Sequence, residues 1–137
     1  GDDTVITGLT ADQIGALLKS MGIEFTQKKD DSGDDLFMMT LSDIKAQLYT
    51  YDKSDATKAY QSIQFHAVFN ADDEQYLKKV NAWNTDRRYS RAYVGSTGNP
   101  HLEADLDLAG GVTVSTVRKF VERYRRSLIG FVAKLTD

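Results

Sequence analysis

Apolar residues recur at intervals of three and four along three segments of the chain, which is the pattern of amphipathic helices. The first predicted helix follows Thr10, a suitable N-cap, and stops at Gly22. The second is capped within residues 71–74 and runs to about Asn84. The third, roughly residues 113–135, is the longest, and its apolar stripe is unbroken. The stripe consists of Val114, Val117, Val121, Tyr124, Leu128, Phe131 and Leu135.

Elsewhere apolar and polar residues alternate, as in strands with one buried face. Short polar turns join most of these stretches, so an antiparallel sheet is expected. The stretch 36–41 is nearly all apolar and predicts a strand that is buried on both faces. The alternation is most regular in 102–108. The predicted strands cover residues 23–28, 36–41, 44–51, 63–69, 89–94 and 102–108.

The predicted element order is α-β-β-β-β-α-β-β-α, so the fold class is α+β, an antiparallel sheet flanked by helices. A length of 137 residues suits one domain covering residues 1–137. Residues 1–8 are expected to be a flexible N-terminal segment. Gly130 in the last helix predicts either fraying or a close contact. The stripe of that helix is expected to pack on its own sheet, and a homodimer that uses Phe120 and Val132 is the alternative.

Charge is divided unevenly along the chain. Ten acidic and four basic residues give residues 1–52 a net charge of −6, while residues 53–137 carry +3. The last helix holds a basic cluster that includes Arg123 and Arg126. Because the whole chain is acidic and no exposed aromatic pattern accompanies the cluster, it predicts a solvated helix face and no nucleic-acid partner.

Motifs for catalysis or metal binding are not evident in the sequence. The acidic run Asp30–Asp35 lacks the glycine and glutamate positions of an EF-hand, so it predicts a solvated hairpin turn. His66 and His101 lie on different predicted elements, and the chain has no cysteine. We therefore predict no metal, no cofactor and no enzymatic activity, with an active site assembled from dispersed residues as the alternative.

The sequence leaves the compartment open. No apolar stretch approaches the ~20 residues that cross a bilayer, so no membrane insertion is expected. The chain begins Gly1-Asp2-Asp3 without a methionine, which is compatible with a leading segment having been removed. The expected location is cytoplasmic, or periplasmic if that segment was a signal peptide.

Three motifs in the second half of the chain resemble the signature of the YbjN family of bacterial sensory transduction regulators. They are Trp83-Asn84 followed by Arg87-Arg88-Tyr89-Ser90-Arg91-Ala92-Tyr93, then Leu102-Glu103-Ala104-Asp105-Leu106-Asp107-Leu108, then Gly110-Gly111-Val112. The resemblance implies a fold similar to type III secretion chaperones, which bind proteins and often dimerise. It implies no cofactor and no catalytic residue.

Three residues are binding candidates. Asn84 and Arg88 are the residues of the signature that folding explains least well. Tyr51, together with Tyr49 and Tyr60, lies near predicted strands and could form an exposed contact surface. We predict a non-enzymatic protein-binding or regulatory module with an unknown protein partner. The alternative is a small-ligand-binding domain or an enzyme with a site between the sheet and the C-terminal helix.

Overall fold

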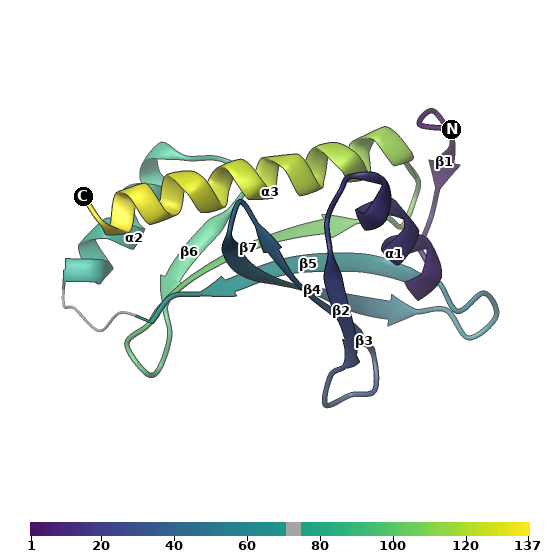
Figure 1. Ribbon diagram of the computed structural model, residues 1–137, viewed down its shortest axis with the longest axis horizontal. Helices are drawn as coiled ribbons and strands as arrows, with labels where there is room; N and C mark the ends of the chain where they lie inside the picture. Colours follow the sequence, from purple (N-terminus) through teal and green to yellow (C-terminus); the bar gives the residue numbers. More distant parts are fainter. Residues whose placement is uncertain (71–74) are drawn as a thin grey trace.

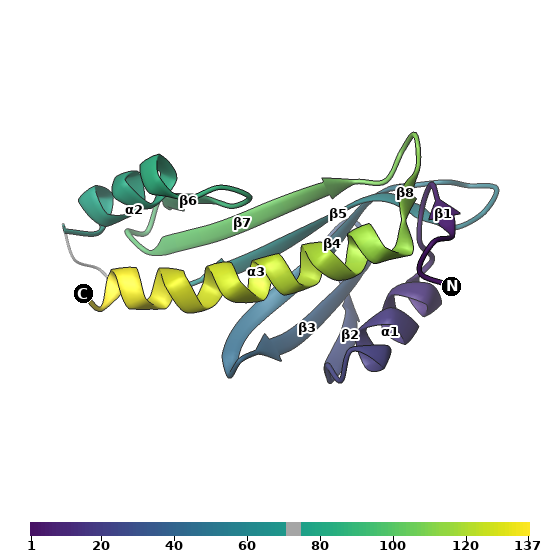
Figure 2. The same ribbon diagram turned by 90° about the horizontal axis from the view of Figure 1, so that it is seen from above.

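The computed structural model describes residues 1–70 and 75–137 of the chain. A six-stranded antiparallel sheet forms its centre, α1 and α3 cover one face, and α2 packs at one end (Figures 1 and 2). The predicted α+β class and the order of the predicted elements are confirmed. The helices are α1 (Ala11–Ser20), α2 (Gln75–Asp86) and α3 (Val114–Leu135). The sheet contains β2 (Phe25–Lys29), β3 (Asp35–Leu41), β4 (Ile44–Lys53), β5 (Tyr60–Val68), β6 (Arg91–Val94) and β7 (Pro100–Asp107).

The strands lie in the order β2-β3-β4-β5-β7-β6, and every neighbouring pair is antiparallel. Consecutive strands from β2 to β5 form a meander. After α2 the chain enters the sheet at its far edge as β6 and returns as β7 beside β5. This return places residues of β5 next to residues that follow more than thirty positions later in the sequence.

A second, two-stranded sheet joins the start of the chain to the start of α3. In it β1 (Val5–Ile6) pairs with β8 (Val112–Thr113). Residues 1–8 were expected to be a flexible segment, and the pairing of Val5 and Ile6 with β8 was not predicted. Runs of two residues carry too little alternation to be recognised as strands in the sequence.

The first helix begins at the predicted N-cap. The Thr10 hydroxyl accepts a hydrogen bond from the Gln13 backbone N–H at 3.2 Å, and the Gln13 side chain accepts one from the Thr10 N–H at 2.9 Å. This reciprocal pair is a capping box, which satisfies two N–H groups that the helix leaves free. Gly22, with φ of +74°, follows the helix in a conformation that glycine adopts without strain.

The core lies between the sheet and α3, as the helical stripe predicted. All stripe residues except Val114 are buried. The Tyr124 ring stacks on Phe65 of β5 with centroids 4.7 Å apart, and Phe120 packs on the same ring at 5.4 Å. The Tyr124 hydroxyl donates to the Leu102 carbonyl oxygen at 2.7 Å, and burial raises its pKa. Aromatic rings therefore occupy the space in which a ligand site between sheet and helix was the predicted alternative.

Two predictions about strand burial were wrong. Residues 36–41 are not buried on both faces, because Leu36 and Met38 point away from the core and are only partly covered. Tyr60, expected to be exposed, is fully buried at the start of β5. The strand predicted at 89–94 begins two residues later, at Arg91, because Tyr89 lies in a bend with φ of +73°. The predicted cap at residues 71–74 lies outside the described residues.

Asp35 was expected in a solvated turn, but it opens β3 and is 5% exposed. Its carboxylate accepts hydrogen bonds from the Tyr60 hydroxyl at 2.7 Å and from the Gln27 amide at 3.0 Å, and pairs with Lys29 at 3.0 Å. The Thr50 hydroxyl donates to its carbonyl oxygen at 2.7 Å. Burial alone would raise the pKa of Asp35, but the hydrogen bonds from Tyr60, Gln27 and Lys29 outweigh it, and the pKa is lowered.

Gly130 brings α3 into close contact with Trp83 of α2. A Cβ atom at position 130 would lie 3.2 Å from the indole ring. The ring cannot move freely, because it packs edge-to-face on Phe131 at 5.3 Å and its N–H donates to the Ser90 hydroxyl at 3.2 Å. The sequence expectation of a close contact at this glycine is confirmed.

We expect Gly130→Ala to lower the free energy of unfolding, measured by urea denaturation. Alanine favours the helix over glycine by about 1 kcal/mol, but crowding a buried ring typically costs about 1–3 kcal/mol. Ala133→Gly, at an exposed position of the same helix, calibrates the helix preference and should lose about 1 kcal/mol. If Gly130→Ala instead raised the free energy of unfolding by about 1 kcal/mol, Trp83 would be able to move aside without an energetic penalty, and the expected crowding would be contradicted.

Candidate functional site

The candidate site is the sheet face opposite α1 and α3, called here the open face. Its side chains belong to β2–β7 and alternate with those of the core. One row of directly paired residues crosses all six strands. The row consists of Thr26, Met38, Gln47, His66, Glu103 and Arg91. The antiparallel register therefore brings residues from both halves of the chain into one line.

The neighbouring row on the open face is also only partly polar. In it Lys28 pairs with Leu36, Leu36 with Tyr49, Tyr49 with Gln64 and Gln64 with Asp105. Leu36, Tyr49 and Gln64 are half-buried, although they lie on the face opposite α1 and α3. Neighbouring side chains contact two of them: the Tyr49 ring lies 6.1 Å from His66, and the Gln64 amide donates to Asp105 at 3.0 Å.

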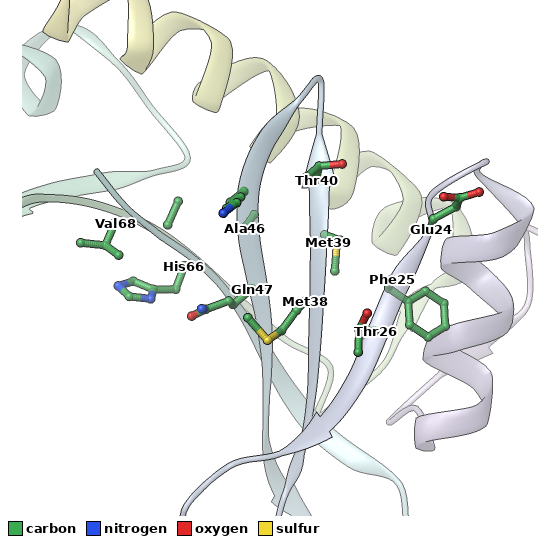
Figure 3. Close-up of a pocket in the computed structure, with 12 residues that line it drawn as sticks. Glu24, Phe25, Thr26, Met38, Met39, Thr40, Ala46, Gln47, His66 and Val68 are labelled. Carbon is green, nitrogen blue, oxygen red and sulfur yellow. The ribbon is translucent and has the colours of Figure 1, made fainter. Parts of the chain in front are cut away.

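A groove of about 560 Å³ lies on the sheet across β2–β5. Figure 3 shows Met38, Gln47 and His66 extending from neighbouring strands toward the same side. Val68, which is 49% exposed, and Thr26 also line the groove. The volume falls within the range of about 300–1,000 Å³ that is usual for small-molecule sites. The groove combines apolar and hydrogen-bonding side chains, so it can bind a group that has both characters.

A polar network borders the groove on β5, β6 and β7. His66 Nε2 lies 2.8 Å from His101 Nδ1, so one ring donates a hydrogen bond to the other. The Tyr93 ring stacks on His101 with centroids 4.6 Å apart, and its hydroxyl donates to Glu103 at 2.9 Å. Arg91 donates to the other Glu103 oxygen at 2.6 Å. These contacts fix the orientation of both imidazole rings.

Burial determines the ionisation of this network. It lowers the pKa of His66, an effect that Glu103 opposes and His101 reinforces. Burial also raises the pKa of Tyr93 to about 12, and the hydrogen bond to Glu103 adds to the shift. At neutral pH His66 is therefore uncharged, and the Tyr93 hydroxyl keeps its proton. Among residues 1–70 and 75–137, no three His, Asp or Glu side chains are grouped to hold a metal ion.

We expect the free energy of unfolding to fall as the pH drops below 6.5, the unperturbed pKa of histidine. The folded protein holds His66 neutral at pH values where the unfolded chain already binds a proton. Its contribution is thus complete above pH 6.5 and is lost as the pH falls through the lowered folded pKa. One such proton changes the unfolding free energy by up to about 1.4 kcal/mol per pH unit. Urea denaturation between pH 7 and pH 5 measures the slope.

His66→Gln is the control for this pH dependence. Glutamine can still hydrogen-bond to His101 but does not titrate, so the variant should show a shallower slope. The same slope in the variant and in the wild type would assign the pH dependence to other groups.

Tyr51, one of the predicted binding residues, lies on the open face. It belongs to β4 and is 39% exposed. Burial raises its pKa, and Tyr49, Asp105 and Glu103 add to the shift. Tyr49 lies nearby on the same strand, where its hydroxyl donates to Gln47 at 3.0 Å.

Asn84 and Arg88, the other two candidates, lie at the corner between α2 and β6. The Asn84 amide donates to the Ala92 carbonyl oxygen at 2.8 Å and accepts from the Ala92 N–H at 2.9 Å. The Asn84 side chain thereby satisfies the backbone N–H and C=O of Ala92 on the free edge of β6. The Arg88 guanidinium lies over the Tyr89 ring. Tyr51 is near the β4–β5 turn, at the end of the sheet opposite α2 in Figure 1, so the structure does not bring the three residues together. Their role in binding stays a prediction.

The pair of His66 and His101 was missed in the sequence. The alternation of 63–69 placed His66 in a strand and left His101 just before the strand predicted at 102–108, but it did not show that these two strands are adjacent. Their contact depends on β7 returning beside β5, and no local pattern encodes that return. The ion pairs of Arg91 with Glu103 and Asp105, both at 2.6 Å, agree with the opposite charges of the two strands.

None of the described helices is long and apolar enough to span a membrane. A comparison with curated proteins gave no match. The family model described as "YbjN: Putative bacterial sensory transduction regulator" matches residues 10–136, nearly the whole chain, including the open face, α2 and α3. The chain therefore belongs to the YbjN family.

Proposed function

We propose that this protein is a non-enzymatic regulatory module that binds a protein partner on the open face. The observation that carries the proposal is the character of that face, where half-buried Met38 and His66 line a groove of about 560 Å³ and half-buried Leu36 and Tyr49 lie in the neighbouring row. The description of the family as sensory transduction regulators supports a role in regulation.

The composition of the open face is unlike that of a sheet face that only contacts water. Such faces in antiparallel sheets are normally polar. Here the face carries side chains of the kinds that are enriched in protein interfaces. They are Met38, Tyr49, Tyr51, Arg91 and Tyr93, and the apolar Leu36 and Val68 lie among them on the same face. Tyr51, Val68 and Tyr93 are 39%, 49% and 37% exposed, so a partner can reach them.

The two edges of the sheet favour binding on the face over the addition of a strand. Asn84 occupies the backbone groups of Ala92 on the β6 edge. The β2 edge carries Lys28 and Lys29, and lysine on an edge strand disfavours pairing with another chain. A partner would therefore contact side chains of the open face and not the backbone of an edge.

Binding of a small ligand is the second candidate, and the groove is the observation that favours it. The space between β5 and α3 is filled by Phe65 and Tyr124, so a ligand would bind between Met38 and His66 on the open face. A thermal-shift screen of metabolites tests this candidate, because a ligand that binds only the folded state raises the unfolding temperature.

Site-specific photocrosslinking in the native cells tests the protein-binding proposal. A photoreactive residue replaces Val68 on the open face or Ile129 on α3, positions that are 49% and 50% exposed. We expect a crosslinked protein from position 68 and not from position 129. The product should be lost when Tyr51→Ala or Met38→Lys is added. Identical products from both positions would contradict binding on the open face.

A further inference from the structure

Two arginines from distant parts of the chain meet at one tyrosine ring. Arg88 follows α2, and its Cζ atom lies 4.8 Å from the centroid of the Tyr89 ring. Arg123 belongs to α3, and its Cζ atom lies 4.1 Å from the same centroid. Tyr89 is 56% exposed, so the cluster is open to solvent. It lies at the corner between α2 and α3, away from the open face.

Neither of these guanidinium groups has a carboxylate partner in the described part of the chain. Arg91, Arg118 and Arg125, by contrast, each form an ion pair. Two like charges near one ring repel each other, and this repulsion opposes the attraction of each cation to the ring. An anion that contacts both guanidinium groups would remove the repulsion.

The backbone of Tyr89 is in an unfavourable conformation. Its φ of +73° lies in the left-handed region, which glycine and asparagine adopt far more readily than a bulky residue. A glycine here would complete the turn after α2 without strain. The backbone conformation therefore does not explain why this residue is a tyrosine. Residues with strained backbones of this kind concentrate at functional sites.

We propose that Arg88, Tyr89 and Arg123 form a binding site for a phosphate group. The ring holds two guanidinium groups in place, and each presents N–H donors in the fork geometry that suits phosphate oxygens. Arg126 lies three residues after Arg123 on the exposed side of α3 and also lacks an ion pair among the described residues. It can add a third positive charge at the rim. This site is separate from the open face and does not depend on the proposed function.

Titration calorimetry with inorganic phosphate at constant ionic strength tests the site. We expect saturable binding by the wild type. Arg88→Gln and Arg123→Gln should each weaken it about tenfold or more, because each removes charge-assisted hydrogen bonds. Arg125→Gln removes the same charge from the same helix, but Arg125 is paired with Glu122, so this variant should bind as the wild type does.

Variants of Tyr89 separate its effect on binding from its effect on folding. Tyr89→Gly relieves the backbone strain, so the variant should remain folded but lose affinity for phosphate. Tyr89→Phe keeps the ring and should retain both stability and affinity. Unchanged phosphate affinity in a folded Tyr89→Gly variant would overturn the assignment of the ring to the site.

O-phosphoserine, used beside inorganic phosphate, distinguishes a phosphate monoester from free phosphate. Tighter binding of phosphoserine identifies an esterified ligand, and equal or weaker binding identifies free phosphate, and both results support the site. Three results would overturn it: no saturable binding of either compound, equal weakening by Arg125→Gln, or no weakening by Arg123→Gln.

Discussion

Tyr60→Phe is expected to lower the free energy of unfolding by about 2–3 kcal/mol, measured by urea denaturation. The hydroxyl donates to the Asp35 carboxylate at 2.7 Å and accepts from the Asp35 N–H at 3.0 Å. Tyr60 is fully buried and Asp35 nearly so, and water cannot replace the lost donor without disturbing the packing. The phenylalanine variant leaves a buried charge with one hydrogen bond fewer, which is the costly case.

Tyr51→Phe is the matched control, because its hydroxyl is on the open face and its loss should change the stability by less than about 0.5 kcal/mol.

The sensitivity of the folded protein to acid provides a second readout. The pKa of Asp35 is lowered from 3.8 in the folded protein, so its contribution is present above pH 3.8 and is lost as the pH falls through the lowered value. Tyr60→Phe should reduce that loss. Equal stability of Tyr60→Phe and wild type would contradict a buried Asp35 network.

Trp83→Ala is expected to have the largest effect, a loss of about 3–5 kcal/mol in the free energy of unfolding. Trp83 is 3% exposed and packs on Phe131 and Gly130 of α3, so it holds α2 against that helix. Its removal leaves a cavity between the two helices and also frees the Ser90 hydroxyl. Chemical denaturation of the variant measures the loss.

Leu77→Ala serves as the control for Trp83→Ala. Leu77 belongs to the same helix but is 65% exposed, so truncation should cost less than about 0.5 kcal/mol. If both variants lost similar amounts of unfolding free energy, the loss would come from a lower stability of α2 itself and not from its packing on α3. The attachment of α2 to α3 through Trp83 would then be contradicted.

The helices could be predicted because their signals are local. The capping box at Thr10 lies within three residues, and the stripe of α3 repeats along one continuous segment. The faces of most strands could also be predicted from alternation. The exception was β3, which has apolar residues on both of its sides, with Leu36 and Met38 on the open face. These two apolar residues belong to the open face and are not covered by a second layer in the part of the fold that the structure describes.

The contacts between distant segments could not be predicted in this way. The burial of Asp35 depends on Tyr60, which follows twenty-five residues later and lies in another strand. The contact of His66 with His101 requires β7 beside β5. The cluster at Tyr89 requires α3 to pass the end of α2. In each case the sequence identifies the element, but only the order of strands and the packing of helices identify the neighbour.

The three methionines of the chain offer a direct test of the central claim, that a protein partner binds on the open face. Met38 points to the open face, Met39 belongs to the core, and Met21 lies at the end of α1. Their methyl signals can be followed by NMR while the crosslinked partner, once identified and purified, is added. We expect the Met38 signal to shift or broaden while the Met21 signal changes little. An unchanged Met38 signal with a shifted Met21 signal would place the partner on the helical side and contradict the account.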